Sequence, residues 1–371
     1  GTSFRRNLVQ MVKAAADEKV YGALKEEMRA HPLWDKAVNS RLNLVFEGQH
    51  TEGFVGRDSL RTLLEKVPVA GKSINALVDA SERAFNYYQN KVMLDAFEYG
   101  LGDIAQRKGG KITERDLEDL VTHINNAAGR GKVTGAKGVD KVINQLLYSG
   151  QMTASRARML GNIATGFQGY SSPEARAYAR AQTARAVIGG AASAGAVVAV
   201  AKLLGQPVRV EKDPRSTDFL KVRIGNTTVD LMGGFQQYLV RGAQVATKQK
   251  KSVTTGKMAP VSATETVATF MRGKLAPGPA AVWDALEKRK VSGEAVDFNK
   301  DPQGAALTTI STLFANLTVD DALSVWKSNP ETMWLMPLGL LGAGLQAGSG
   351  AKDDWLDSST RKMDQKVSDE L

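Results

Sequence analysis

The chain has 371 residues, of which 43% are hydrophobic and 24% charged, a composition typical of globular protein and sufficient for two or three domains. It contains no Cys, which excludes disulfides, thiol catalysis and Cys-based metal sites. Aromatic residues make up only 6% while glycines number 36, so the composition favours close helix packing over a dense aromatic core.

The net charge of +10 is unevenly distributed. Residues 128–258 contain 20 Lys and Arg against 6 Asp and Glu, which gives this stretch +14 and leaves −4 for the rest. Such a basic block indicates a polyanionic partner, either nucleic acid or anionic lipid; the alternative is a solvated surface that keeps the protein soluble. The candidate contacts are Arg130, Lys132, Arg156, Arg158, Lys248, Lys250 and Lys251.

Two helices are expected in the first third, over residues 4–29 and 74–107. The KGGK sequence at 108–111 ends the second with glycines, and Thr113 with Asp116 three residues later predicts the cap of a further helix. Residues 129–138 (GRGKVTGAKG) are expected to form a basic linker. Ser172 as cap and Pro173 at the first position predict another helix, which continues to about residue 204 before Gly205 and Pro207.

A β-hairpin is expected within residues 208–232. Residues 219–224 and 227–232 flank Gly225-Asn226, a pair suited to the positive backbone angles of a two-residue turn. This turn places Val222 opposite Val229, Ile224 opposite Thr227, Leu220 opposite Leu231 and Lys221 opposite Asp230. Residues 208–211 are a candidate third, edge strand.

The remaining helices are expected at 234–249, 262–273, 278–288, 303–315, 319–328 and 334–347, with a basic loop at 248–257. The fold class is therefore mainly α, a multi-helix protein with one small antiparallel β-hairpin at about 208–232. We divide the chain into an N-terminal helical region (1–128), a central basic region with a long helix and the hairpin (129–258), and a C-terminal helical region (259–371).

Two stretches carry no charge. Residues 186–201 fall short of the roughly 20 apolar residues that a bilayer span requires, and residues 332–351 include a Pro and several Gly. The composition favours two buried helices in a water-soluble core. The alternative is a segment that is soluble in one state and inserted in a membrane in another.

The sequence shows no pattern typical of a catalytic site. His31, His50 and His123 are far apart, and Glu47, Glu52, Asp116 and Asp119 have no partner that would pair them as acid and base. Residues 66–73 (KVPVAGKS) resemble a phosphate-binding loop, but Lys66 replaces its first glycine. We therefore expect surface or partly buried histidines, solvated carboxylates at the surface, no cofactor, no metal and no enzymatic activity.

Residues 213–219 (DPRSTDF) combine a turn-initiating Asp213-Pro214 with Asp218 and two hydroxyl side chains. Their oxygens could hold a cation, but a turn locked by its own side chains is the favoured interpretation.

Residues 213–237 (DPRSTDFLKVRIGNTTVDLMGGFQQ) resemble a segment near the C-terminal end of very large bacteriophage proteins, the phage large polyvalent proteins. The most specific part is the hairpin with its exit at Gly233, Gly234 and Phe235. Shorter pieces follow in the same order: ASERAF at 80–85, INNAAGRGK at 124–132, TASRARML at 153–160, KSVTTGK at 251–257 and FMRGKLAPGP at 270–279.

This resemblance implies a virion protein that is packaged in the particle and ejected with the genome. We expect a structural or conduit role in DNA delivery across the host envelope, with other virion proteins (portal, tail or ejection proteins), genomic DNA and the host membrane as partners and homo-oligomers as the state. The expected location is the virion, inside the capsid or near the tail, and then the host envelope. The alternatives are a non-catalytic anchor domain of a processed virion polyprotein enzyme, such as a polymerase or toxin, and a head-assembly protein.

Overall fold

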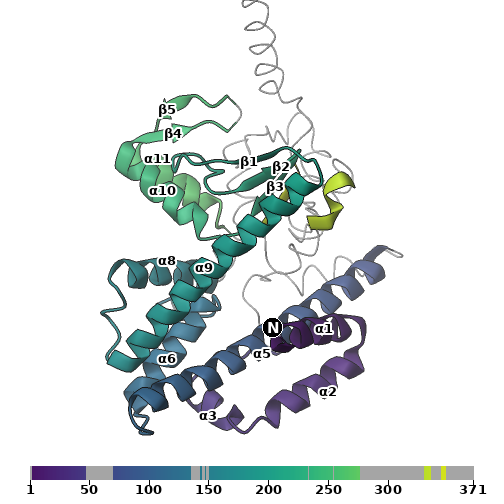
Figure 1. The fold of residues 1–371 in the computed structure, drawn as a ribbon, viewed down its shortest axis with the longest axis vertical. Helices are drawn as coiled ribbons and strands as arrows, with labels where there is room; N and C mark the ends of the chain where they lie inside the picture. The colour runs from purple at the N-terminus through teal and green to yellow at the C-terminus, as the bar shows by residue number, and fades with distance from the viewer. Residues whose placement is uncertain are drawn as a thin grey trace, which may run out of the picture. The chain divides into compact units, whose positions relative to one another are not determined.

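The computed structural model describes residues 2–46, 70–134, 143, 147, 150–232, 234–253, 255–275, 330–335 and 344–347. Over these residues the chain is mainly helical, with a few short antiparallel strands in two small sheets (Figure 1). The fold class expected from the sequence is thus confirmed. The chain divides into two compact units: Gly1–Ala186 with Met271–Leu313 form unit 1, and Val187–Phe270 with Phe314–Leu371 form unit 2. Our three-part division by charge stays a prediction.

Unit 1 is built from helices. They are α1 (Thr2–Ala16), α2 (Glu18–Arg29), α3 (Trp34–Asn39), α5 (Ala70–Arg107), α6 (Glu114–Ala127), α8 (Gly150–Ala164) and the first half of α9 (Pro173–Leu203). The helix expected at 4–29 is wrong in one respect: it is two helices, because the Asp17 side chain accepts a hydrogen bond from the Lys19 amide and starts α2. Helix α5 confirms the prediction at 74–107, and the chain leaves it through Gly109 and Gly110, both at positive φ.

The main core of unit 1 lies where α5, α6 and the start of α9 meet. It contains Phe97 and Ile104 from α5 and Leu120 from α6, all fully buried. Gly100 permits this close approach, because a Cβ at that position would lie 2.4 Å from Leu120 Cδ1. A second cluster joins α1 and α2 to α5 around Tyr21.

The predicted caps are present. Thr113 and Asp116 form a capping box at the start of α6. At the start of α9 the Ser172 hydroxyl accepts a 3.1 Å hydrogen bond from the Ala175 amide, and α9 ends before Gly205 at positive φ. Helix α9 contributes its residues up to 186 to unit 1 and the others to unit 2.

Unit 2 contains a four-stranded antiparallel sheet of order β1-β2-β3-β6. Its strands are β1 (Val208–Val210), β2 (Val222–Ile224), β3 (Thr227–Asp230) and β6 (Gly344–Ala347). Val222 pairs with Val229 and Ile224 with Thr227, so the hairpin register is confirmed, as is the third strand at 208–210.

The hairpin is shorter than expected. Leu220 has φ 58° and Lys221 donates a 3.0 Å hydrogen bond to Asp218, so neither residue extends β2 toward Leu231 or Asp230. The predicted pairs Leu220–Leu231 and Lys221–Asp230 are therefore wrong. The sequence also does not predict strand β6. Of the helix expected at 334–347, the described residues belong instead to a short 3-10 helix, η1 (Pro330–Leu335), and to β6.

The rest of unit 2 comprises α10 (Gln236–Thr247), β4 (Gln249–Lys251), β5 (Met258–Pro260) and α11 (Ala263–Arg272). The helices match the predictions at 234–249 and 262–273. The expected basic loop at 248–257 is shorter than predicted: residues 249–251 form β4, which pairs with β5, and the described residues from 252 to 257 connect the two strands. The helices expected at 278–288, 303–315 and 319–328 lie outside the described residues.

Candidate functional site

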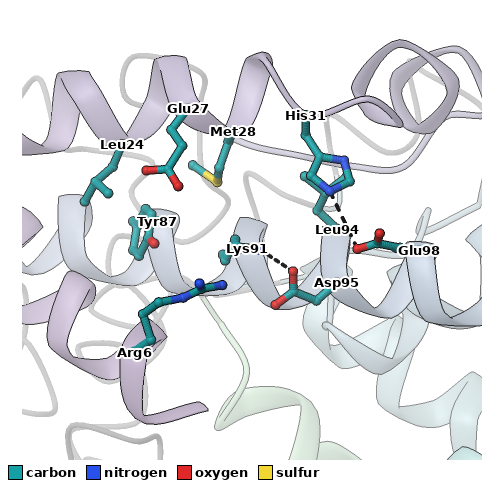
Figure 2. A pocket seen from close by; sticks show the side chains of 10 residues that line it. All are labelled: Arg6, Leu24, Glu27, Met28, His31, Tyr87, Lys91, Leu94, Asp95 and Glu98. Atoms are coloured by element: carbon teal, nitrogen blue, oxygen red, sulfur yellow. Dashed lines mark hydrogen bonds and ion pairs between the residues drawn. The ribbon is translucent and has the colours of Figure 1, made fainter. Parts of the chain in front are cut away.

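A cavity of about 460 Å³ lies among α1, α2 and α5 (Figure 2). Its lining is mostly charged or polar: Arg6, Leu24, Glu27, Met28, His31, Tyr87, Lys91, Leu94, Asp95 and Glu98. Lys91 donates to Asp95, which also accepts a 3.2 Å hydrogen bond from Asn7. Burial and the charges of Glu27 and Asp95 raise the pKa of Tyr87 to about 12, so this hydroxyl stays protonated at neutral pH.

His31 illustrates how these groups engage one another. Its Nδ1 accepts a 3.2 Å hydrogen bond from the Leu33 amide, which leaves Nε2 to carry the proton and face Glu98 at 3.6 Å. One ring nitrogen thus holds the backbone and the other lies next to a carboxylate, so His31 is positioned by groups of the chain itself. Two pairs of lining groups, Lys91 with Asp95 and His31 with Glu98, thus face each other across or along this interhelical cavity.

Asp116 corrects the expectation of a solvated carboxylate. It is fully buried, and it accepts hydrogen bonds from Lys108 (2.8 Å), from the Thr113 amide (2.7 Å) and from the Ser172 hydroxyl (2.5 Å). These donors hold its pKa well below the ordinary range although burial alone would raise it. Asp119 accepts from the Ser172 amide at 2.7 Å, so the two carboxylates of α6 together fix the start of α9. Glu47 and Glu52 lie outside the described residues.

His123 is likewise buried, at 4% exposure, where we expected a surface or partly buried residue. The rings of Phe167, Tyr170 and Tyr178 surround it edge-on at centroid distances of 5.7 to 6.2 Å. Tyr170 Oη lies 3.4 Å from Nδ1. Burial lowers the pKa of His123 to about 4, so the imidazole is neutral and packs as an aromatic side chain. His50 lies outside the described residues.

Arg130 is the main correction among the predicted polyanion contacts. It is 7% exposed, and its guanidinium donates to Asn90 Oδ1 at 2.5 Å and to the Asn43 carbonyl at 3.1 Å. Burial lowers its pKa to about 10. Because its donors face the interior of unit 1, Arg130 is a structural residue and is withdrawn as a phosphate contact.

The other basic residues lie nearer the surface but differ in how far they are engaged. Arg158 donates to the carbonyls of Lys132 and Val133. Burial, together with the charge of the partly buried Arg156, lowers the pKa of Lys274 to about 8. Lys132 itself is exposed.

Three of the candidate lysines belong to unit 2 and lie in β4 or directly before it. Lys250 pairs with Glu265 at 3.0 Å and Lys251 with Glu211 at 2.7 Å. Lys248 is exposed and has φ 54°, a left-handed conformation that turns the chain from α10 into β4. The structure thus brings Lys248, Lys250 and Lys251 together, whereas Lys132, Arg156 and Arg158 belong to unit 1.

The motif at 213–219 is a side-chain-locked turn, as favoured from the sequence. Asp213 accepts from the Arg215 amide at 3.0 Å and from its guanidinium at 2.9 Å, and α10 secures the turn through Gln244, which donates to the Arg215 carbonyl. Asp218 pairs with Lys221, and Gly225 and Asn226 form the hairpin turn. Pro214 is exposed in this turn; Gly234 and Phe235 lead into α10, and Gly233 lies outside the described residues.

Helix α9 overturns the preferred interpretation of residues 186–201. It is long and apolar enough to cross a membrane, yet only 11% of an 18-residue apolar window is buried within the chain. Val187 is 64% exposed and Ile188 68% exposed. A core helix would bury these side chains, so residues 186–196 are not part of the core over the described residues, whereas Val197 and Ala201 at the end of the stretch are buried.

Among the described residues no group of three or more His, Asp or Glu side chains could hold a metal ion. Comparison with known proteins found no matching family model, no matching curated protein and no matching solved structure.

Proposed function

We propose that this chain is a bacteriophage virion protein that is packaged with the genome and ejected with it, and that it has a structural role in carrying DNA across the host envelope. The observation that carries the proposal is the exposed apolar stretch of α9. Its 16 residues, 186–201, contain no charge and lie between Arg185 and Lys202. A helix that is apolar on all sides is stable when surrounded by lipid or by other helices, which is the environment of an envelope conduit.

The basic balance of the same part of the chain supports this role. Residues 128–258 carry +14, and Lys132 and Lys248 are exposed there. Cations of this kind neutralise phosphates of DNA or phospholipid without base recognition, as a protein that accompanies a genome of any sequence requires.

The first test is mass spectrometry of purified virions, before and after ejection is triggered. We expect peptides of the chain in filled particles, their loss from emptied particles, and their appearance in the envelope fraction of infected cells. A protein found only in head precursors and absent from mature particles would instead be a head-assembly protein. A covalently attached enzymatic module in the particle would favour the anchor-domain alternative.

The second test isolates α9. Ile188→Asp places a charge in the apolar stretch at a side chain that is already 68% exposed, so folding should be unaffected. Val267→Asp on α11, at 54% exposure, is the matched control. Both variants should be packaged normally, and only Ile188→Asp should lose genome delivery, measured as DNA entry per adsorbed particle. Equal delivery by the two variants would refute a role for α9.

A further inference from the structure

The apolar stretch of α9 has two parts that differ in what they contact. Residues 186–196 contain no buried side chain. From residue 197 the helix packs on the sheet of unit 2: Val197 is 7% exposed and Ala201 fully buried. Their cluster also contains Val222, Ile224, Val229 and Leu335, which come from β2, β3 and η1.

The free part is poorly suited to a helix in water. A Cβ added at Gly189, Gly190 or Gly195 would meet no atom within 4 Å, so no packing within the chain requires these glycines. Each costs a helix interior about 0.5–1 kcal/mol relative to Ala. Residues 186–196 therefore gain little from propensity or from contacts, and an apolar medium that leaves backbone groups no partner except each other would stabilise their helix.

The length of the apolar helix determines whether it can span a bilayer. Eleven residues rise only about 16 Å, roughly half the ~30 Å hydrocarbon core of a bilayer. The full charge-free stretch, 186–201, rises about 24 Å. With Arg185 and Lys202 extending their side chains to the phosphates on either side, that stretch approaches a complete span.

A second copy of the chain fits these observations less well. A partner helix would cover one side only, while every residue from 186 to 196 is exposed except Gly190 and Ala194, which are partly buried. The segment is rich in Gly and Ala, so it offers little area against the ~800 Å² per partner of a standard interface. Cations at both ends instead match the anionic headgroups of a phospholipid bilayer.

Two further contacts hold the segment that follows α9, one to η1 and one to the hairpin turn of the sheet. The Trp334 indole donates to the Gln206 side chain at 3.4 Å, and the Gly225 amide at the hairpin turn donates to the Pro207 carbonyl at 3.0 Å. Residues 197–201, which the exposed part of α9 would need in order to span a bilayer, are thus the residues that pack on the sheet.

We propose that the β1-β2-β3-β6 sheet is a latch: it withholds residues 197–201 of α9 from the bilayer, and their release from the sheet lengthens the apolar helix until it can insert in an anionic membrane. This inference rests on the proposed envelope role and specifies how membrane insertion of α9 is regulated. The latch keeps the protein from inserting before delivery, and separation of α9 from the sheet is the committing step.

The absence of Cys permits a direct test, because one introduced Cys is labelled uniquely. Ala192→Cys in the free part and Ala199→Cys in the retained part, both exposed, would each carry an environment-sensitive fluorophore. The full-length protein is mixed with vesicles of phosphatidylglycerol and phosphatidylethanolamine. In the otherwise unchanged chain we expect a blue shift at 192 and little change at 199.

Latch-weakening substitutions should then move position 199 into lipid. Val197→Ala removes two methylene equivalents from the cluster and makes α9 less hydrophobic, so faster entry cannot result from hydrophobicity. We expect at least a ~tenfold rise in the rate of the shift at 199, since cavities of this size weaken packing measurably. Ile224→Ala should do the same from the sheet side, and Val245→Ala, at an exposed site on α10, is the matched control.

Circular dichroism and urea unfolding will identify any variant that fails to fold, and Val197→Ala keeps the test valid if Ile224→Ala does so. Entry of position 199 at the same rate in the parent, Val197→Ala and Val245→Ala chains would overturn the latch while leaving the envelope role intact. If neither label responds to vesicles in any folded variant, the membrane role itself fails.

Discussion

The buried His123 makes the stability of unit 1 depend on pH in a defined window. An imidazole in an unfolded chain takes up a proton near pH 6.5, whereas burial among Phe167, Tyr170 and Tyr178 lowers the pKa of His123 to about 4 in the folded chain. Between these values the unfolded state binds more protons, so the free energy of unfolding must decrease as the pH falls from 6.5 to 4. Above pH 6.5 the contribution of this residue is constant.

The size of the effect follows from the shift. Each pKa unit corresponds to about 1.4 kcal/mol, so His123 alone should remove about 3 kcal/mol of stability across the window. At 4% exposure the group needs no discount for solvent screening. That loss is a large part of the 5–15 kcal/mol typical of a domain.

The measurement is urea unfolding at a series of pH values, read locally by hydrogen exchange and mass spectrometry of α6 peptides. His123→Phe retains an aromatic ring without a titrating group and should abolish the slope between pH 6.5 and 4. Acid loss below pH 4 should persist in this variant, because Asp116 has a lowered pKa and its contribution disappears as that carboxyl is protonated. An unchanged slope in His123→Phe would refute the reasoning.

Two further predictions use matched pairs. Gly100→Ala should lower the stability of unit 1 by about 1–3 kcal/mol, because the added Cβ would overlap Leu120. Gly102→Ala on the same helix adds a Cβ that meets no atom, so it should stabilise the unit by up to about 1 kcal/mol. Thermal unfolding measures both variants, and equal effects would contradict the packing of α5 on α6. Arg130→Met should destabilise unit 1 by about 2–4 kcal/mol by leaving buried acceptors unpaired, with no change in the salt dependence of DNA binding. Lys248→Ala should leave the stability unchanged but reduce the slope of DNA-binding affinity against salt concentration, measured by fluorescence anisotropy.

Local signals in the sequence predicted the fold best. The Gly225-Asn226 turn fixed the hairpin register, and Ser172-Pro173 and Thr113 located two helix starts, because each signal acts over a few residues. Long-range pairing was beyond such reasoning: β6 joins β3 across more than a hundred residues, and nothing in its own sequence marks it as a strand.

The polar interior of unit 1 escaped prediction for a related reason. On α5 the apolar side chains of Phe85 and Val92 are exposed, whereas the amides of Asn86 and Asn90 are fully buried. The buried amides are needed because Asn90 pairs with the backbone of Val45 through both its oxygen and its nitrogen. Whether such a side chain is buried depends on its partner in the folded chain, and the spacing of apolar residues along one helix does not reveal that partner.

The candidate sites show the same limit. Charge counting correctly found a basic region but could not separate the buried Arg130 from the exposed Lys248, since burial depends on the fold. The composition of residues 186–201 was interpreted as core because most apolar helices are buried. Only the structure showed that this one is exposed.

The fourth strand has a consequence for synthesis. Strands β1 to β3 emerge from the ribosome well before β6, which closes the open edge of β3. At roughly 5–20 residues per second, the 113 residues between β3 and β6 require about 6–23 s, during which the hydrogen-bonding groups of that edge are unpaired. Leu335, which completes the cluster under α9, is also made late in this interval. The nascent chain therefore carries an exposed apolar helix and an open sheet edge together, so its yield in the cell should depend on chaperones that shield both until residue 347 has been added.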